Sequence, residues 1–110
     1  MNPKTKQQFE NILMFAKRVQ ERMKNISLET FSTDEYLQDA VLFCIGHIGE
    51  TAKKIPNEEQ EKYPQLFWKM MIGLRNRLFH DYYEIDLSKI YEITQEPISQ
   101  LIKMLESILD

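Results

Sequence analysis

One short segment carries most of the information in this chain, and it reads Gly73-Leu74-Arg75-Asn76-Arg77-Leu78-Phe79-His80-Asp81-Tyr82-Tyr83. Within an otherwise helical, apolar pattern it brings together an arginine, an amide and a histidine (Arg75, Asn76 and His80), and Tyr82 follows the histidine after one residue. Arginine is a permanent, planar, anion-binding cation, and histidine can give or take a proton near neutral pH. An arginine together with a histidine is what an enzyme needs to attack a phosphodiester without a metal.

The apolar spacing on either side of this segment predicts helices. Pro64 can open the helix that contains the segment. Trp68 in that helix, like Phe67 and the Met70-Met71 pair, is expected to be a core residue and not a base-stacking platform. A short helical turn is expected just before it, over residues 57–62. Asp86 is a good N-cap for the following helix. Pro97 lies in the middle of that helix's apolar run, so we expect a kink or a short break there.

Two longer helices are predicted in the first half of the chain. Pro3 suits the first turn of one of them, whose apolar stripe covers residues 9–26. Polar residues break the pattern over residues 25–31. Ser32 with Glu35 then fits a capping box, which predicts the start of the second helix.

The second of these helices is predicted to end near Ile55, and it contains Gly46 and Gly49. A glycine costs a helix interior about 1 kcal/mol relative to alanine, so we expect another helix to cross closely at this point. Cys44 lies in the apolar run of the same helix and is expected to be a core residue. As the only cysteine it rules out an intramolecular disulfide and fits a reducing compartment.

The sequence therefore predicts one all-α domain over residues 1–110, an up-down bundle of four main helices. With 43% hydrophobic and 28% charged residues, both a core and a polar surface are expected, and three Gly and four Pro argue against a β fold. Because the core of so short a chain is limited, an oligomer would stabilise it. No signal peptide and no apolar span of ~20 residues is seen, so a cytoplasmic protein without membrane contact is expected.

The formal net charge of −3 argues against tight, general RNA binding, because proteins that neutralise phosphates are usually basic. A small local basic site is still compatible with this charge. Lys69, Arg75 and Arg77 cluster where such a site would be needed. The acidic run at residues 58–61 is interpreted as a solvated face.

Helical spacing indicates which side chains of the segment could act together. At about 100° per residue, Asn76, His80 and Tyr83 share one line, and Arg75 and Tyr82 share the neighbouring one. Arg75 and His80 are about 140° apart, so a single chain would be a poor catalyst. Two copies facing each other across a two-fold axis could gather both arginines and both histidines around one cleft.

Each residue also has a simpler interpretation. His80 could be a structural histidine near a helix C-terminus, where positive charge is favoured. Arg75 could be an ordinary salt-bridge partner, and Asn76 an inert helical amide. His47 and Glu50 have the spacing of half a metal site, but no second pair of ligands stands nearby, so no metal is expected. For Glu50, a carboxylate paired with an arginine of the segment is at least as good an interpretation as a catalytic role.

Residues 75–82 resemble the arginine–amide–histidine signature of the HEPN superfamily, and in particular its HepT-like ribonuclease toxin branch, in which His-x-Tyr follows. Residues 48–53 are similar to an Ile-Gly-Glu-Ala-Ala-Lys stretch common in that branch, with Thr51 as the departure. The likeness covers roughly residues 39–86. It implies the helical bundle already expected, acting as a dimer with a composite site.

The resemblance further implies the toxin component of a type VII toxin–antitoxin system, an endoribonuclease without metal or cofactor. His80 of one copy would act as general base on the ribose 2′-OH, and His80 of the other would protonate the leaving 5′-oxygen. Arg75 would stabilise charge on the phosphoryl oxygens. Asn76 would orient His80 or the phosphate.

The resemblance also implies a partner, an MNT-type nucleotidyltransferase antitoxin that transfers AMP to Tyr82, with Tyr83 as the competing acceptor. A larger assembly with the antitoxin is compatible with this. Two alternatives remain: a non-catalytic substrate-binding or regulatory subunit of a small nucleotidyltransferase, and an inert helical dimerisation module. The net charge favours the subunit, whereas Arg75 with His80 favours the nuclease, because binding alone needs no proton-transfer group.

Overall fold

The computed structural model describes all 110 residues, and every regular element in it is a helix. In chain order the elements are α1 (Pro3–Met23), α2 (Leu28–Thr33), α3 (Glu35–Lys54), α4 (Asn57–Glu61), α5 (Trp68–His80), the 3₁₀ helix η1 (Tyr82–Glu84), α6 (Leu87–Thr94) and α7 (Glu96–Leu109). The predicted all-α class is therefore confirmed. None of these helices combines the length and the hydropathy needed to span a lipid bilayer.

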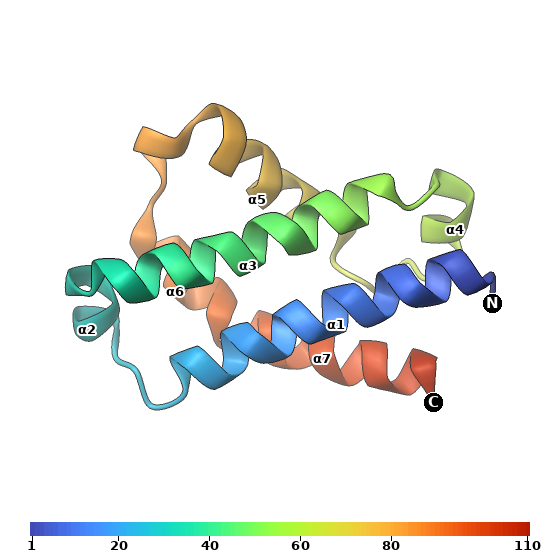
Figure 1. Cartoon of the computed structure of the whole chain (residues 1–110), viewed down its shortest axis with the longest axis horizontal. Coiled ribbons are helices and arrows are strands. Elements are labelled where there is room, and N and C mark those ends of the chain that lie inside the picture. Colours follow the sequence, from blue (N-terminus) through green and yellow to red (C-terminus); the bar gives the residue numbers. More distant parts are fainter.

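The long helices alternate in direction (Figure 1). α1 and α3 lie antiparallel and side by side, α5 packs on α3, and α7 packs on α1. The fourth predicted helix is divided into α6 and α7, because the backbone leaves the helical region at Gln95 (φ −90°, ψ −114°), two residues before Pro97. The up-down bundle of four main helices and the break near Pro97 are both confirmed.

The start of α3 was predicted wrongly. Ser27 accepts a hydrogen bond from the backbone N–H of Thr30, and this cap opens the additional short helix α2 in the stretch where no helix was expected. Ser32 lies inside α2, and Asp34 is the N-cap of α3, where its carboxylate accepts from the N–H of Leu37 at 3.0 Å. Ser32 and Asp34 both suit an N-cap by residue type, and the chain uses Asp34.

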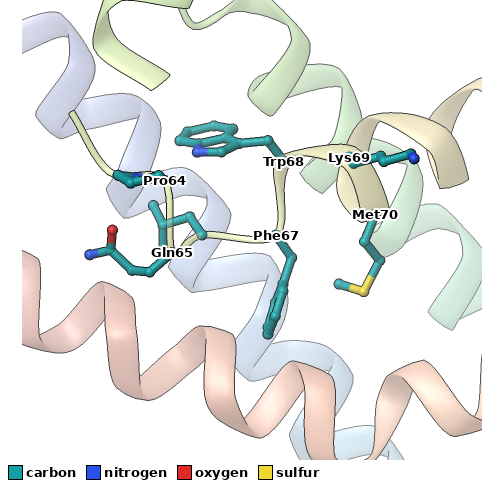
Figure 2. Close-up of a pocket in the computed structure, with 7 residues that line it drawn as sticks. Pro64, Gln65, Phe67, Trp68, Lys69 and Met70 are labelled. Atoms are coloured by element: carbon teal, nitrogen blue, oxygen red, sulfur yellow. The ribbon is translucent and has the colours of Figure 1, made fainter. Parts of the chain in front are cut away.

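The start of α5 was also predicted too early, because residues 64–67 form a turn (Figure 2). The N–H of Trp68 donates to the carbonyl of Leu66 at 2.6 Å, and its indole N–H donates to the carbonyl of Tyr63 at 2.9 Å. These bonds hold the chain out of the helical conformation until Trp68. The indole is partly buried and lies against Phe9, with ring centroids 6.0 Å apart, as expected of a core side chain.

The core consists of 20 buried apolar residues, contributed largely by α1, α3 and α7. Cys44 is one of them, with 3% of its surface exposed, which confirms its predicted role. Burial raises the pKa of its thiol, because the thiolate is poorly solvated there. The thiol is therefore kept neutral and unreactive.

The acidic run before Tyr63 is only partly the solvated face that was predicted. Glu59 is 6% exposed. Its carboxylate pairs with the ammonium of Lys62 at 2.6 Å and accepts from the hydroxyl of Thr5 at 3.1 Å, which ties α4 to α1. The hydrogen bond from Lys62 is the main reason why the pKa of Glu59 lies below its ordinary range, and the hydrogen bond from Thr5 adds to it.

We expect Glu59→Gln to lower the free energy of unfolding at neutral pH and to have no such effect in acid. Since the folded-state pKa of Glu59 is lowered, its ionised form stabilises the fold above the unfolded-state pKa, and this contribution is lost as the pH falls through the folded-state value. Urea unfolding of both chains from neutral pH downward measures the difference. A difference that persists in acid would assign the effect to packing instead of charge.

The predicted close crossing of two helices occurs at Gly49. A Cβ placed there would meet both the Cβ of Arg75 and the backbone carbonyl oxygen of Met71, so α3 and α5 touch backbone to backbone. At Gly46 the nearest atom is the Cδ1 of Leu78 at 3.6 Å, an ordinary contact. The prediction is therefore confirmed, with Gly49 as the residue that permits the approach.

Candidate active site

Arg75 is held on α5 by three neighbours. Its Nε donates to Oε2 of Glu50 at 2.7 Å, and its Nη1 donates to Oδ1 of Asn76 at 3.0 Å. The guanidinium carbon lies 4.6 Å from the centroid of the Phe79 ring, a cation–π contact. Only 17% of the side chain is exposed. Two of the five N–H donors of the guanidinium are thus used, and the others can still meet an anion.

Glu50 comes from α3 and reaches Arg75 across the Gly49 crossing. The hydrogen bond from Arg75 is the main reason why the pKa of Glu50 lies below its ordinary range, so the carboxylate stays ionised in the pair. Lys54 stands 3.9 Å away on the same helix. The interpretation of Glu50 as a carboxylate paired with an arginine of the segment is confirmed.

His80 is the last residue of α5, and its side chain is exposed. Because both residues lie in one continuous helix, the calculated separation of about 140° around the axis holds for His80 and Arg75. Asn76 is on the His80 line but is hydrogen-bonded to Arg75. A single chain therefore brings Arg75 and Asn76 together, and it leaves His80 on another face.

Tyr82 and Tyr83 lie beyond the end of α5. The prediction that they share helix faces with Arg75 and His80 is therefore wrong. α5 ends at His80, Asp81 turns the backbone (φ −131°, ψ 39°), and Tyr82 begins η1. The two rings meet edge to face, with centroids 5.9 Å apart. Tyr82 is 52% exposed and Tyr83 is fully exposed. Tyr83 therefore does not pack on another helix, and both hydroxyls can be reached from solvent.

A hollow of about 280 Å³ lies beside the Arg75–Glu50 pair, between α3 and α5. Its rim is formed by Phe43 and Phe79, which are 59% and 61% exposed. His47 also lines it, and its ring stacks on Phe15 with centroids 5.0 Å apart. The residues of the chain include no cluster of three or more side chains that could hold a metal ion.

The sequence reasoning missed Phe79 as a neighbour of Arg75. The signal was present, since residues four apart on a helix face each other and an arginine stacks well on an aromatic ring. Phe43 could not have been found in this way, because its position beside Phe79 depends on how α3 and α5 cross.

We expect Glu50→Ala to lower the kcat of any reaction that uses Arg75 by about tenfold or more, because a misplaced catalytic group costs at least that much. Glu50→Gln should lose much less, since its amide oxygen can still accept the Nε hydrogen of Arg75. KM should change less than kcat in both variants. If Glu50→Ala were as active as the parent, the carboxylate would be a mere competitor of the substrate for Arg75.

Comparison with known proteins supports the resemblance seen in the motif. A family model described as "Ribonuclease HepT-like" matches residues 12–108. A protein of Caldanaerobacter subterraneus subsp. tengcongensis named "Putative RNase" is 35% identical over 91% of this chain and 89% of its own length. In Thermococcus cleftensis, "Probable ribonuclease HepT" is 30% identical over 87% of each chain. No solved structure gave a significant match.

Proposed function

The chain belongs to the HepT-like ribonuclease family, and from this premise we propose that it is a metal-independent endoribonuclease, the toxin of a type VII toxin–antitoxin system. The observation that carries the proposal is the fixed guanidinium of Arg75, held by Glu50 and Asn76 on the helix that ends in His80. Residues 1–110 act as one domain in the cytoplasm, and RNA is the substrate.

The reaction is a transesterification within the RNA. The imidazole of His80 takes the proton of a ribose 2′-OH, whose oxygen bonds to the adjacent phosphorus. The bond from phosphorus to the 5′-oxygen breaks, and that oxygen leaves with a proton from His80 of the second copy. Arg75 stabilises the negative charge on the phosphoryl oxygens with its free N–H groups. The products carry a 2′,3′-cyclic phosphate and a 5′-hydroxyl.

The reaction needs a homodimer, because one chain holds Arg75 and His80 on different faces of α5. The two copies meet over the hollow between α3 and α5, where the exposed rings of Phe43 and Phe79 offer apolar surface beside Arg75. Sedimentation equilibrium of the purified chain tests this point. A monomer at assay concentrations that cleaved RNA would contradict it.

The toxin is neutralised by an MNT-type nucleotidyltransferase, which transfers AMP from ATP to the phenolic oxygen of Tyr82 with release of pyrophosphate. The position of Tyr82, two residues beyond His80 as in the His-x-Tyr pattern, supports this choice, and its side chain is half-exposed. The added nucleotide would bring bulk and negative charge beside the site. Mass spectrometry of peptides after co-expression with such an enzyme identifies the acceptor, and an adduct confined to Tyr83 would overturn the assignment.

The experiment that tests the nuclease is incubation of the chain with cellular RNA in excess EDTA. Mass measurement first excludes a modified tyrosine. Cleavage with cyclic-phosphate ends is expected, and an oligonucleotide with a single 2′-deoxy position should resist at that position. A cleavage that stops in EDTA would contradict the metal-free mechanism. An unmodified dimer that cuts nothing would favour the non-catalytic subunit of a nucleotidyltransferase.

A further inference from the structure

A second hollow, of about 230 Å³, lies on the other side of α5, between α5 and α6. Lys69 and Arg77 from α5 and Lys89 from α6 line it, together with apolar residues that include Leu74 and Ile90. It is separate from the Arg75–Glu50 pair, since Arg77 is about 160° from Arg75 around the helix. The site described above makes no use of it.

The charge of this hollow is opposite to that of the whole chain. None of its three cations takes part in an ion pair, whereas the chain carries a net −3. The one carboxylate at the rim, Asp86, is bound as the N-cap of α6, where it accepts from the N–H and the hydroxyl of Ser88. Three cations against one carboxylate leave an excess of positive charge, which attracts an anion.

The cations are arranged along a line that leads to His80. Lys69, Gly73 and Arg77 are four residues apart and share one face of α5, and His80 is one turn beyond Arg77. From Lys69 to Arg77 this face is about 12 Å long. Gly73 adds no side chain, and nothing lies within 4 Å of where its Cβ would be, so the surface between the two cations is open.

At its other end the hollow continues into a larger one of about 630 Å³ around the 64–67 turn, because Lys69 and Met70 line both. The side chains of Phe67 and Met70 point the same way there, below the turn (Figure 2), and both pack partly on the core while they line the hollow. Together the two hollows form a groove with cations on one part and an aromatic ring on the other, which we call the α5–α6 groove. Phosphates and unpaired bases bind to surfaces with these two properties.

We propose that the α5–α6 groove binds the single-stranded RNA substrate on one side of the cleavage point. Lys69, Arg77 and Lys89 contact successive phosphodiesters, and Phe67 with Met70 offers apolar surface to a base. The strand then reaches His80 from Arg77, the residue one turn before it. This inference rests on the proposed ribonuclease function, and it explains how a chain with net negative charge holds RNA.

The test measures binding without cleavage, in the His80→Ala chain. The groove variant adds Lys69→Gln, Arg77→Gln and Lys89→Gln. The control variant adds Lys4→Gln, Lys24→Gln and Lys103→Gln, which change the net charge equally at exposed positions outside the groove. Fluorescence anisotropy with a labelled single-stranded RNA gives Kd at several salt concentrations. Circular dichroism checks that each variant folds.

The groove variant should bind RNA roughly tenfold more weakly at low salt, and the slope of log Kd against log salt should fall by about 2, as expected for three lost phosphate contacts. The control variant should change little. Equal losses in both variants, or no RNA binding by the His80→Ala chain, would overturn the proposal. Displacement of the RNA by AMP would also overturn it and assign the groove to a free nucleotide. Because these assays do not depend on cleavage, they fail independently of the nuclease proposal.

Discussion

Replacement of His80 by alanine will reduce RNA cleavage by about 10²–10⁴-fold, the usual contribution of a general acid or base. The fold should be retained, because the side chain is exposed at the end of α5 and has no part in the core. In a dimer both copies lose their imidazole, so neither the 2′-OH nor the leaving oxygen has a proton-transfer group. Initial rates on a labelled RNA, with EDTA present, measure the loss.

The chain supplies its own control for this prediction, since it has only two histidines. His47→Ala removes an exposed imidazole that lies outside the motif, stacks on Phe15 and contacts Phe43 in a tilted arrangement. Because His47 lines the hollow where the two copies are proposed to meet, the rate is compared at a concentration where the dimer is complete, and there the loss should be no more than a few-fold. Equal losses from the two variants would indicate damage to the α3–α5 face instead of lost acid–base chemistry. A His80→Ala chain that cuts as fast as the native one would end the proposed mechanism.

The sequence predicts the relative directions of three side chains of the site, those of Arg75, Asn76 and His80. All three lie in one helix, so local spacing fixes these directions. The partner Glu50 could only be suggested. Apolar periodicity shows which face of a helix is buried, but it does not show which two faces meet, and Glu50 precedes Arg75 by 25 residues. Gly49 predicts that another helix crosses closely at this point, because a glycine in a helix interior is typical of such a crossing. It does not show which helix crosses.

The boundaries that were predicted wrongly have a common cause. Ser27 and Thr30 were interpreted as breaking a helix, yet Ser27 caps one. Pro64 suits the first turn of a helix, yet the indole of Trp68 holds the preceding turn by a hydrogen bond across five residues. Neither Gly nor Pro marks the end of α5, so the sequence pattern predicts no helix boundary between His80 and Tyr82. The hydrogen bonds of Ser27 and Trp68 are both local, and composition alone does not show which of several possible caps and turns the chain adopts.

Gly49→Ala will destabilise the fold by about 1–3 kcal/mol, the usual cost of overpacking, although alanine is the better helix former. The added methyl meets the Cβ of Arg75 and the carbonyl oxygen of Met71, and neither belongs to a flexible chain end that could move aside. α5 must therefore shift away from α3. Arg75 then moves relative to Glu50, so RNA cleavage should fall together with the free energy of unfolding.

The other two glycines make this prediction specific to the crossing. Gly73→Ala meets nothing within 4 Å in an exposed helix, so it should stabilise the fold by about 1 kcal/mol. Gly46→Ala would make an ordinary contact with Leu78 at 3.6 Å and should lie between the two. Urea unfolding of the three variants gives the order directly. If Gly49→Ala proved as stable as Gly73→Ala, α3 and α5 would not be in backbone contact, and the placement of Arg75 by Glu50 would lose its structural basis.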